Sequence, residues 1–481
     1  MNNHFAKASS AAIPITPVAT DGFRTWLAKQ PARLQAWVRS AKFDGSAGSV
    51  SLVTGRSGEL ERVLLGIGEA RAAAASVFAA GLGGAPSAVT WRYAGLPGRL
   101  PLSTYRIDAR LTPDEATKAA LGWALGCYAY TRYRKKPASF AKLVWPQGCD
   151  IAAVERTAAA TMLARDLITT PAADMGPGEL AAAAAAVAKT HRAKLRLVVG
   201  DDLLKQNYPM IHAVGRASTR PPRLIDITWG DPKAPKVTLI GKGVCFDTGG
   251  YDLKPSSGMK LMKKDMAGAA QALALGQMVM AANLSVRLRI LMPAVMNMVD
   301  GNAILPLDVI PTRKGISVEI GNTDAEGRLI LCDAIADAVA EEPAVMFDFA
   351  TLTGAARTAL GTDVPVLFSN DETLAQDLLR HGASAEDPMW PLPLWRPYRE
   401  MLNSKTADIN NISDGPYAGA ITAALFLQEF VPAGVSWAHL DFMGWTLSAK
   451  PGRPEGGEPQ GMRAIFSLLE ERFGKGRPVR N

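Results

Sequence analysis

The chain has 481 residues, of which 48% are hydrophobic and 20% are charged, and its formal net charge is +8. This is an ordinary globular composition, and the length suggests two or more domains. Residues 1–150 carry 19 Lys and Arg against 9 Asp and Glu, so the whole positive excess lies in the first third of the chain. No apolar run of about 18 residues is free of charge, so we expect no membrane span.

The cysteine pattern excludes a zinc motif. Cys127, Cys149, Cys245 and Cys332 form no CxxC pair and lie too far apart to be read as one metal site. The first 23 residues also lack the uninterrupted apolar core of a signal peptide. The simple interpretation is a reduced, cytoplasmic protein.

The N-terminal third, residues 1–150, alternates strand-like and helix-like segments, which predicts an N-terminal α/β domain. Residues 49–68 indicate a strand, a turn and a second strand, whereas the Ala-rich residues 70–82 favour a helix. Residues 116–133 are a further helix candidate. The densest basic segment is YTRYRKKP, residues 130–137. Its interleaved Tyr residues leave nucleic-acid binding open beside the simpler interpretation of a charged helix end.

Residues 152–168 contain helix-forming residues throughout and no Gly or Pro, so we predict a long helix. We place this connecting helix at residues 151–170 and a larger catalytic domain at residues 171–481. Apolar strands alternate with helices in the second domain, which predicts a mostly parallel central sheet covered on both faces. The expected strands lie within residues 194–200, 223–230, 236–243, 286–295 and 343–354.

Charged residues follow one of these strands closely. The strand VTLIGKG leads into VCFDTGGYDLKPSSGMKLMKKDM, which contains Lys242, Asp247, Lys254 and Asp265. Functional loops of such sheets lie at the carboxyl ends of the strands, so we expect these residues to meet there. Taken singly, Asp265 is more simply a helix cap and Lys254 a surface lysine.

The segment GNTDAEGRLILCDAI, residues 321–335, adds Asp324, Glu326 and Arg328 just before an apolar helix. If the segment is extended, the three side chains leave on the same side. Four carboxylates at one end of a sheet repel one another without cations, whereas with a lysine nitrogen they can hold two divalent metals. Oxygen-rich ligation suits Mg or Mn, and also Zn where the geometry is fixed.

Histidine does not contribute to this cluster. None of the five histidines lies in the charged loops, and the sequence contains no HExxH motif. His439, in WAHLDF, is interpreted as a hydrogen-bonded core residue rather than a ligand. The chain also lacks the GxxxxGK[ST] order of a P-loop and the GxSxG nucleophile elbow. The candidate site is therefore a carboxylate cluster.

The segment NTDAEGRL, residues 322–329, resembles the signature of the leucyl aminopeptidase (cytosol aminopeptidase) family. The similarity covers most of residues 165–445, whereas the first third shows little that matches. The resemblance implies an N-terminal α/β domain, a connecting helix and a catalytic α/β domain, assembled as a homohexamer. The blocks that match in order are GKGVCFDTGGYDLKP (241–255), LMKKDMAGAA (261–270), ATLTGA (350–355), ADINNISDGPYAGAITAALFLQEFV (407–431) and WAHLDFMG (437–444).

The resemblance also implies an enzyme that removes N-terminal residues from peptides with two metal ions, Zn or Mn and in principle Mg. Asp247 and Glu326 would bridge both metals. Asp324 would complete the looser site through its carboxylate and main-chain oxygen. Lys242 and Asp265 would complete the tighter site.

The remaining roles concern the substrate. The resemblance implies that Lys254 polarises the scissile carbonyl and that Arg328 holds a bicarbonate ion, which acts as the general base. The free α-amine of a peptide would ligate one metal, which explains why only peptides with a free N-terminus are cleaved. The implied substrate-binding residues are Met262, Thr351, Leu352 and Gly354.

The sequence departs from the common family pattern near the specificity pocket. Tyr251 follows the Gly pair where a small residue is usual, and Met443, followed by Trp445, also replaces a small residue. We expect a narrower pocket if these side chains point into it, and an unchanged one if Trp445 packs into the core. Two rival functions remain: a hexameric nucleic-acid-binding protein that uses the basic N-terminal domain, and a pseudoenzyme, against which the intact set of ligands argues.

Overall fold

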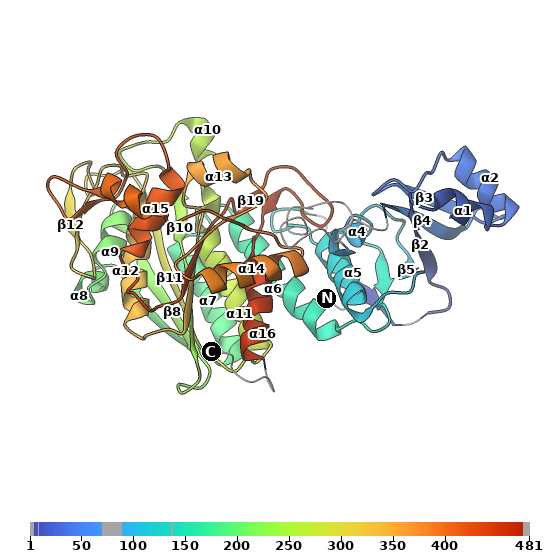
Figure 1. Cartoon of the computed structure of the whole chain (residues 1–481), viewed down its shortest axis with the longest axis horizontal. Coiled ribbons are helices and arrows are strands. Elements are labelled where there is room, and N and C mark those ends of the chain that lie inside the picture. Colours follow the sequence, from blue (N-terminus) through green and yellow to red (C-terminus); the bar gives the residue numbers. More distant parts are fainter. Residues whose placement is uncertain (1–3, 8, 70–88, 136–137, 475–481) are drawn as a thin grey trace. The chain divides into compact units, whose positions relative to one another are not determined.

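The computed structural model describes residues 4–7, 9–69, 89–135 and 138–474, and the chain divides into two compact units (Figure 1). One unit comprises residues 1–162 and 448–455, and the other comprises residues 163–447 and 456–481. The predicted helix at residues 70–82 lies outside the described residues. The proposed connector is one continuous helix, α6 (Ile151–Thr169), and the division between the units falls within it.

The smaller unit is built on a six-stranded sheet with the order β1-β6-β5-β2-β4-β3. Neighbouring strands run parallel except β3, which pairs antiparallel with β4. The predicted α/β class and the strand pair within residues 49–68 are confirmed. The strands are β1 (Phe5–Ala6), β2 (Ile13–Ala19), β3 (Val50–Thr54), β4 (Leu60–Gly68), β5 (Thr104–Ile107) and β6 (Lys142–Val144). The described helices before α6 are α1 (Phe23–Ala28), α2 (Ala32–Ser40), α4 (Val89–Ala94) and α5 (Pro113–Gly126).

Helix α5 differs from its prediction at both ends. Thr112 caps its N-terminus, because the Thr112 hydroxyl accepts a hydrogen bond from Glu115 N and the Glu115 carboxylate accepts one from Thr112 N. The helix ends at Gly126, seven residues before the predicted end at residue 133. Gly has the weakest helix propensity after Pro, and the prediction overlooked it. The basic segment 130–137 therefore follows the helix rather than ending it, and its residues 136–137 lie outside the described part.

The larger unit contains a nine-stranded sheet with the order β16-β15-β18-β14-β9-β11-β8-β7, and β10 pairs with β11 beside this path. The central strands β18, β14, β9, β11 and β10 run parallel to one another. Strand β15 pairs antiparallel with β18, β8 pairs antiparallel with β11, and β7 pairs antiparallel with β8. A mostly parallel centre is thus confirmed. The strands are β7 (Lys194–Val199), β8 (Arg223–Trp229), β9 (Lys236–Gly241), β10 (Gly243–Asp247), β11 (Arg287–Asn297), β14 (Val345–Ala350), β15 (Val366–Ser369), β16 (Trp390–Pro391) and β18 (Trp437–Asp441).

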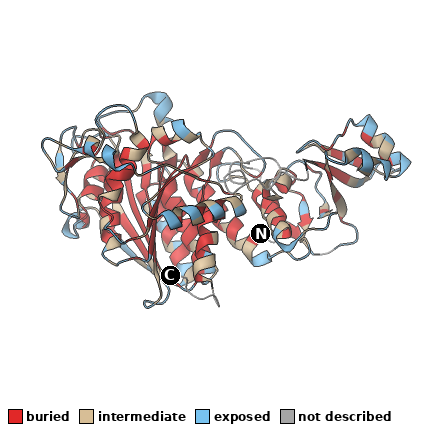
Figure 2. Ribbon diagram, in the orientation of Figure 1, coloured by how far each residue is buried: buried red, intermediate tan, exposed pale blue. Residues whose placement is uncertain are grey.

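Helices cover both faces of this sheet (Figure 1). Helices α9, α12 and α15 pack on one face, and α7, α11, α14 and α16 lie on the other. The central strands and the inner sides of these helices are buried (Figure 2). The helices are α7 (Pro177–His191), α8 (Asp202–Lys205), α9 (Pro209–Gly215), α10 (Ser256–Met259), η1 (Met262–Met266), α11 (Ala267–Ala281), α12 (Glu326–Val339), α13 (Gly354–Leu360), α14 (Glu372–Ser384), η2 (Arg396–Leu402), α15 (Gly419–Gln428) and α16 (Met462–Phe473).

Two small sheets complete the larger unit. One has the order β12-β13-β17 and the other pairs β19 with β20. Within the described residues, no helix combines the length and apolar character needed to cross a membrane. All four cysteines are free thiols. The strands of the small sheets are β12 (Val309–Pro311), β13 (Ser317–Glu319), β17 (Ile409–Asn410), β19 (Trp445–Thr446) and β20 (Gly456–Gly457).

The carboxyl ends of the parallel strands bring chemistry-bearing residues to one edge of the sheet, as predicted. Lys242 follows β9 directly, and Asp247 is the last residue of β10. Asn297 ends β11, Thr351 follows β14, and Asp441 ends β18. Because these strands are parallel neighbours, their ends define the floor of one site.

Candidate metal centre

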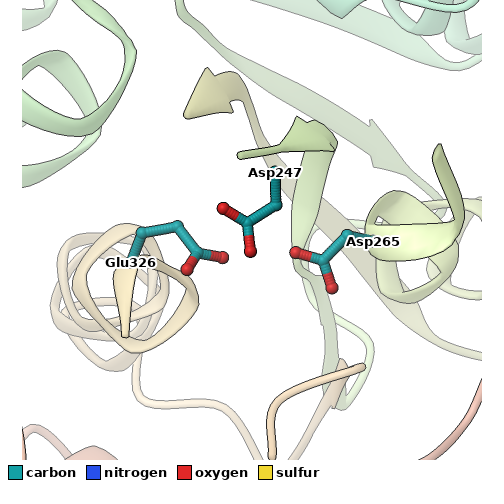
Figure 3. Close-up of side chains that lie close together, drawn as sticks. All are labelled: Asp247, Asp265 and Glu326. Carbon is teal, nitrogen blue, oxygen red and sulfur yellow. The ribbon is translucent and has the colours of Figure 1, made fainter. Parts of the chain in front are cut away.

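Three buried carboxylates converge at this edge. Asp247 comes from the end of β10, Asp265 from η1 and Glu326 from the first turn of α12, and their side chains point toward one another (Figure 3). One oxygen atom from each lies within 4.8 Å of the others, and each residue is at most 2% exposed. Burial, and then the charge of Asp265, raises the pKa of Asp247 to about 6. Burial followed by the charge of Asp247 raises the pKa of Glu326 well above its usual value.

Lys242 links two of these carboxylates. Its Nζ lies 2.8 Å from Asp265 Oδ2 and 2.8 Å from Glu326 Oε1. Burial opposes the charged form of this lysine, but the neighbouring carboxylates, Asp265 foremost, outweigh it and raise its pKa. Burial likewise opposes ionisation of Asp265, but Lys242 more than offsets it and lowers the pKa of that carboxyl. The simpler interpretation of Asp265 as a helix cap is wrong, because its oxygens contact Lys242 and Thr351 rather than the N-terminus of α11.

Lys254 and Asp324 form the more open side of the cluster. Lys254 Nζ lies 2.8 Å from Asp247 Oδ2 and 2.5 Å from Asp324 Oδ1, and its side chain is only 15% exposed. Burial opposes its charge, but the two carboxylates, Asp247 first, raise its pKa, so the side chain stays an ammonium ion. Asp324 lies outside the group of three and has a 34% exposed side chain. It follows β13 of a small sheet rather than a strand of the main sheet, which corrects the expectation for this motif.

The glycine pair in FDTGG makes this arrangement possible. Gly249 has a φ of +93° and Gly250 a φ of +66°, so the chain turns sharply after Asp247. A Cβ at Gly249 would lie 2.5 Å from the carbonyl oxygen of Asp252 and 2.9 Å from the nitrogen of Lys254. Any larger residue would therefore push Lys254 away from the carboxylate that precedes the turn.

The donor set fits divalent cations. The ion pairs join four carboxylates with two lysines, which leaves an excess of two negative charges. Asp265 Oδ2, Glu326 Oε1 and Asp324 Oδ1 are buried atoms without a hydrogen bond to any described residue. Each of these oxygens instead forms an ion pair with a lysine ammonium group, Asp265 Oδ2 and Glu326 Oε1 with Lys242 and Asp324 Oδ1 with Lys254. Buried carboxylate oxygens of this kind are suitable ligands for hard divalent metals.

The prediction that Asp324, Glu326 and Arg328 share one side of an extended segment is wrong. Glu326 begins α12, and residues two apart in a helix point in nearly opposite directions. Arg328 is buried, and its Nη1 donates a 2.6 Å hydrogen bond to the carbonyl oxygen of Asn411, whereas its Nε has no hydrogen-bond partner among the described residues. Burial lowers the pKa of Arg328 to about 10, which leaves the guanidinium charged at neutral pH.

The predicted substrate-binding residues lie close to the carboxylates in the fold. Thr351 Oγ1 donates a 2.6 Å hydrogen bond to Asp265 Oδ1, a contact that the sequence did not predict. Asp441 Oδ1 accepts the backbone N–H groups of Leu352 and Thr353 at 2.9 and 3.2 Å. Gly354 begins α13 directly after this turn. Met262 is buried in η1, the helix that also contains Asp265.

Three polar residues of the site were not predicted from the sequence. Asn297 Nδ2 donates to Asp247 Oδ1 at 2.9 Å and to the carbonyl oxygen of Thr323 at 3.1 Å. Asp441 holds the turn after β14, and Asn411 contacts Arg328. Asn297 and Asp441 are the last residues of largely apolar strands, so a search for polar residues at strand ends would have found them.

His439 lies in β18 as a core residue, which confirms its interpretation. Its Nδ1 lies 2.6 Å from Asp348 Oδ1, and Trp437 Nε1 donates to Asp348 Oδ2 at 2.7 Å. Burial opposes protonation, but the charge of Asp348 outweighs it and raises the pKa of this histidine. The imidazole is thus held by the strand next to it and is not a ligand of the carboxylate cluster.

Two family models match the chain. Residues 162–466 match the catalytic domain of the cytosol aminopeptidase family, and residues 13–146 match the N-terminal domain of M17 aminopeptidases. The second match covers the part of the chain in which the motifs gave little resemblance. Together the two matches agree with the two-unit architecture.

Individual proteins give the same result. A probable cytosol aminopeptidase of Geobacter sp. is 36% identical over 90% of both chains. One of Desulfovibrio desulfuricans is 43% identical over 65% of this chain and 64% of its own. The crystal structure of the Coxiella burnetii cytosol aminopeptidase matches with 45% identity and a TM-score of 0.91, covering 98% of this chain and all of the other. The bottromycin maturation enzyme BotP in complex with Mn matches with 33% identity and a TM-score of 0.81 over 96% and 99% of the two chains.

Proposed function

Because the chain belongs to the cytosol aminopeptidase family, we propose that the site removes N-terminal residues from peptides with the help of two divalent metal ions. The family makes the chain an aminopeptidase of the metallo-exopeptidase class. The observation that carries the two-metal proposal is the convergence of three buried carboxylates, which with Asp324 exceed the two lysines paired with them by two negative charges.

We propose that Asp247 and Glu326 bridge the two ions, that Lys242 and Asp265 complete one site, and that Asp324 completes the other. Bound divalent ions supply Lewis acidity, which lowers the pKa of water and polarises a carbonyl group. Asp324 is the most exposed of these residues, which supports its place in the looser site. The Mn in one structural neighbour favours Mn beside Zn as the metal, and Mg remains a third candidate.

The proposed role of Lys254 is to donate a hydrogen bond to the scissile carbonyl oxygen as negative charge develops there. Its ammonium state and its place between Asp247 and Asp324 support this role. Arg328 would hold a bicarbonate ion, which supplies the general base. The buried, charged guanidinium with an unpaired Nε supports an anion there. Arg328→Ala should therefore lower turnover by about 10–10⁴-fold, the order of general-base contributions or somewhat less.

The substrates are proposed to be peptides with a free N-terminus, bound along Thr351, Leu352 and Gly354. Met443 and Met262 are both nearly buried, which supports a narrow side-chain pocket. Met443 and Trp445 do not lie on one extended strand, because Gly444 between them has a φ of +68°. Trp445 is buried, with Lys263 Nζ 5.1 Å from its ring centroid. Rates on Leu, Ala, Phe and Trp p-nitroanilides test the pocket, and cleavage of the Trp substrate as fast as the Leu substrate would refute a narrowed one.

The decisive test of the proposed function is metal removal. Exhaustive chelation should abolish hydrolysis of Leu p-nitroanilide, and added Mn or Zn should restore it. Full activity with a metal content of nil would overturn the site. A homohexamer and a cytoplasmic location are proposed from the resemblance, and light scattering of the purified protein tests the assembly. The relatives named above are enzymes, which gives no support to the nucleic-acid-binding alternative.

A further inference from the structure

We infer that Asn411 is a positioning residue that fixes the segment carrying Asp324 and Glu326 and, at the same time, the guanidinium of Arg328. The inference rests on the proposed function, since it assigns these three residues to metal and anion binding. Asn411 itself touches none of the proposed metal ligands with its side chain. Its contacts are instead with the backbone that places them.

The side chain of Asn411 is fully buried and uses its hydrogen-bonding capacity on one loop. Its Oδ1 accepts the N–H groups of Gly321 at 2.8 Å and Asn322 at 3.2 Å. Its Nδ2 donates to the carbonyl oxygens of Asn322 at 2.8 Å and Ala325 at 3.4 Å. An amide offers two acceptor lone pairs and two donor hydrogens, so residues 321–325 occupy all four.

The backbone of Asn411 extends this connection in both directions. Its N–H donates to the carbonyl oxygen of Glu319 at 3.0 Å, directly after the parallel pairing of β17 with β13. Its carbonyl oxygen accepts the 2.6 Å hydrogen bond from Arg328 Nη1. One residue therefore contacts the strand before the loop, the loop itself and the first turn of α12.

This connection acts on distances that matter for catalysis. Asp324 Oδ1 lies 2.5 Å from Lys254 Nζ, and Glu326 Oε1 lies 2.8 Å from Lys242 Nζ, so both carboxylates occupy a crowded site. Residues that support metal ligands in this way typically change metal affinity or activity by about 10–100-fold when replaced. A shift of about 1 Å in a reacting group can cost a similar factor.

The adjacent Asn410 provides a matched control. It has the same side chain, but its Oδ1 accepts the N–H of Ile412 and its Nδ2 donates to Glu319 Oε2. Neither contact involves residues 322–328. A general loss of stability at this edge would follow from either substitution, whereas a loss of positioning should follow only from the change at Asn411.

The experiment measures two quantities for Asn411→Ala, Asn411→Asp and Asn410→Ala. The first is the affinity for Mn²⁺ alone, by calorimetry on metal-free protein. The second is the split between kcat and KM on Leu p-nitroanilide. We expect Asn411→Ala to weaken Mn²⁺ binding and to lower kcat by about 10–100-fold with little change in KM, because Asn411 does not touch the substrate. Asn410→Ala should stay within threefold of the parent chain in both quantities.

Asn411→Asp keeps the size of the side chain and the two contacts to N–H groups, so it tests the inference if Asn411→Ala does not fold. The carboxylate oxygen that replaces Nδ2 would face the carbonyl oxygens of Asn322 and Ala325 and repel them. This variant should therefore lower kcat and Mn²⁺ affinity as well. The inference is overturned if a folded Asn411 variant matches the parent chain in both measurements, or if Asn410→Ala shows equal losses. A parent chain that neither binds Mn²⁺ nor cleaves the substrate would instead refute the proposed function.

Discussion

Two clusters of charged side chains in the larger unit differ in how their charges are balanced. The metal cluster consists of Asp247, Asp265, Asp324, Glu326, Lys242 and Lys254. The arginine network consists of Arg196, Arg289, Arg313, Asp226, Asp337 and Glu341 on β7, β8, β11, α12 and the loops beside them. The first has four acids against two bases. The second has three acids against three bases, and a fourth base, Arg287, also pairs with Glu341, so its carboxylates are not in excess.

Arg289 is the centre of the arginine network. Its Nε and Nη2 donate to the two oxygens of Asp226 at 3.1 and 3.0 Å, and Nη2 also donates to Asp337 Oδ2 at 2.5 Å. Arg313 donates to the other oxygen of Asp337 at 2.8 Å, and Arg196 donates to Asp226 Oδ2. Among the described residues, every buried side-chain atom of this network has a hydrogen-bond partner. In the metal cluster, three buried carboxylate oxygens have only ion-pair contacts with lysines.

We interpret the difference as that between a structural cluster and the proposed metal site. Planar guanidinium groups match carboxylates in pairs and satisfy their oxygens, so the arginine network needs no further ligand. Lysine ammonium groups leave carboxylate oxygens unsatisfied in the metal cluster, and an excess of negative charge remains. Buried charge that is unbalanced within the protein is a sign of a bound ion or a reaction.

The largest expected effect is a loss of activity without a loss of fold. Asp247→Asn keeps an oxygen that accepts the hydrogen bonds of Gly249 N and Asn297 Nδ2, but removes one negative charge from the crowded group. Activity should fall by more than about 10³-fold, beyond the effect of losing one hydrogen-bond donor. The free energy of unfolding of the metal-free protein should stay equal or rise. Near-normal rates would end the assignment of a bridging ligand.

The opposite result is expected in the arginine network. Arg289→Met should lower the free energy of unfolding by about 3–5 kcal/mol, because it leaves buried carboxylates with fewer partners. The rate per folded molecule should be unchanged. Urea unfolding and kcat measure the two quantities, and Arg380→Met is the control, since its pairs with Glu471 and Asp377 are largely exposed and should contribute less than about 1 kcal/mol. If the activity of folded Arg289→Met dropped with its stability, the two clusters would not be separable.

Lys254 should separate chemistry from metal binding inside the metal cluster. Lys254→Ala should reduce turnover by about 10²–10³-fold, the scale for one donor to a developing oxyanion. The metal content of the protein should remain that of the parent chain, because Lys254 is not a proposed ligand. Lys205→Ala removes an exposed lysine paired with Asp202 and should leave the rate unchanged. Loss of metal from the Lys254 variant would show that this lysine holds the cluster together instead.

A third kind of buried carboxylate gives the smallest expected effect. Asp333 in α12 accepts backbone N–H groups of Met210, Ile211 and Arg313 at 2.8, 3.4 and 2.8 Å. Burial outweighs these bonds and raises the pKa of Asp333 from 3.8 to about 7. A raised pKa in the folded state means that the contribution of this group to stability is complete below about pH 4 and is lost as the pH rises through about 7.

The variant Asp333→Asn should remove this pH dependence. The difference in unfolding free energy between the variant and the parent chain should shift in favour of the variant from pH 5 to pH 8. At about 1.4 kcal/mol per pKa unit, the shift is on the order of a few kcal/mol. Urea titrations at four pH values measure how this difference in unfolding free energy changes with pH. That change is independent of any pH-independent destabilisation that the amide side chain causes. A flat difference across that range would mean that the carboxylate is ionised throughout.

The fold and the carboxylate cluster were predictable for different reasons. Apolar strands alternating with helices fixed the α/β class, and the rule of strand ends brought Lys242 and Asp247 to one edge. The ligand set itself depended on the resemblance. Local geometry was less predictable: the segment at Glu326 begins a helix, and α5 stops at Gly126. Propensity does not show where a tertiary contact will begin or end an element.

The neutral residues of the site gave little signal in the sequence beyond the position of Asn297 at the end of a strand. Asn297 and Asn411 carry no charge, and their role comes from contacts with segments 26 to 90 residues away. The hydrogen bond from the Thr351 hydroxyl to Asp265 likewise had no signal in the sequence. Such contacts are set by the packing of distant strands and loops, which neither periodicity nor composition describes. The charged residues that follow β9 and β13 were noticed because they are closely spaced beside apolar segments, whereas Asp441 was not.

The wide spacing of the ligands has a consequence for the order of folding. Asp247, Asp265 and Glu326 lie within a stretch of about 80 residues, and they meet only when β10, η1 and α12 are in place. Closing such loops costs entropy, and like charges add to that cost until a cation arrives. The strand ends should therefore be the last part of the larger unit to become protected from hydrogen exchange, and metal ions should slow exchange there more than in the arginine network. In this protein the catalytic ions would also act as the final step of folding.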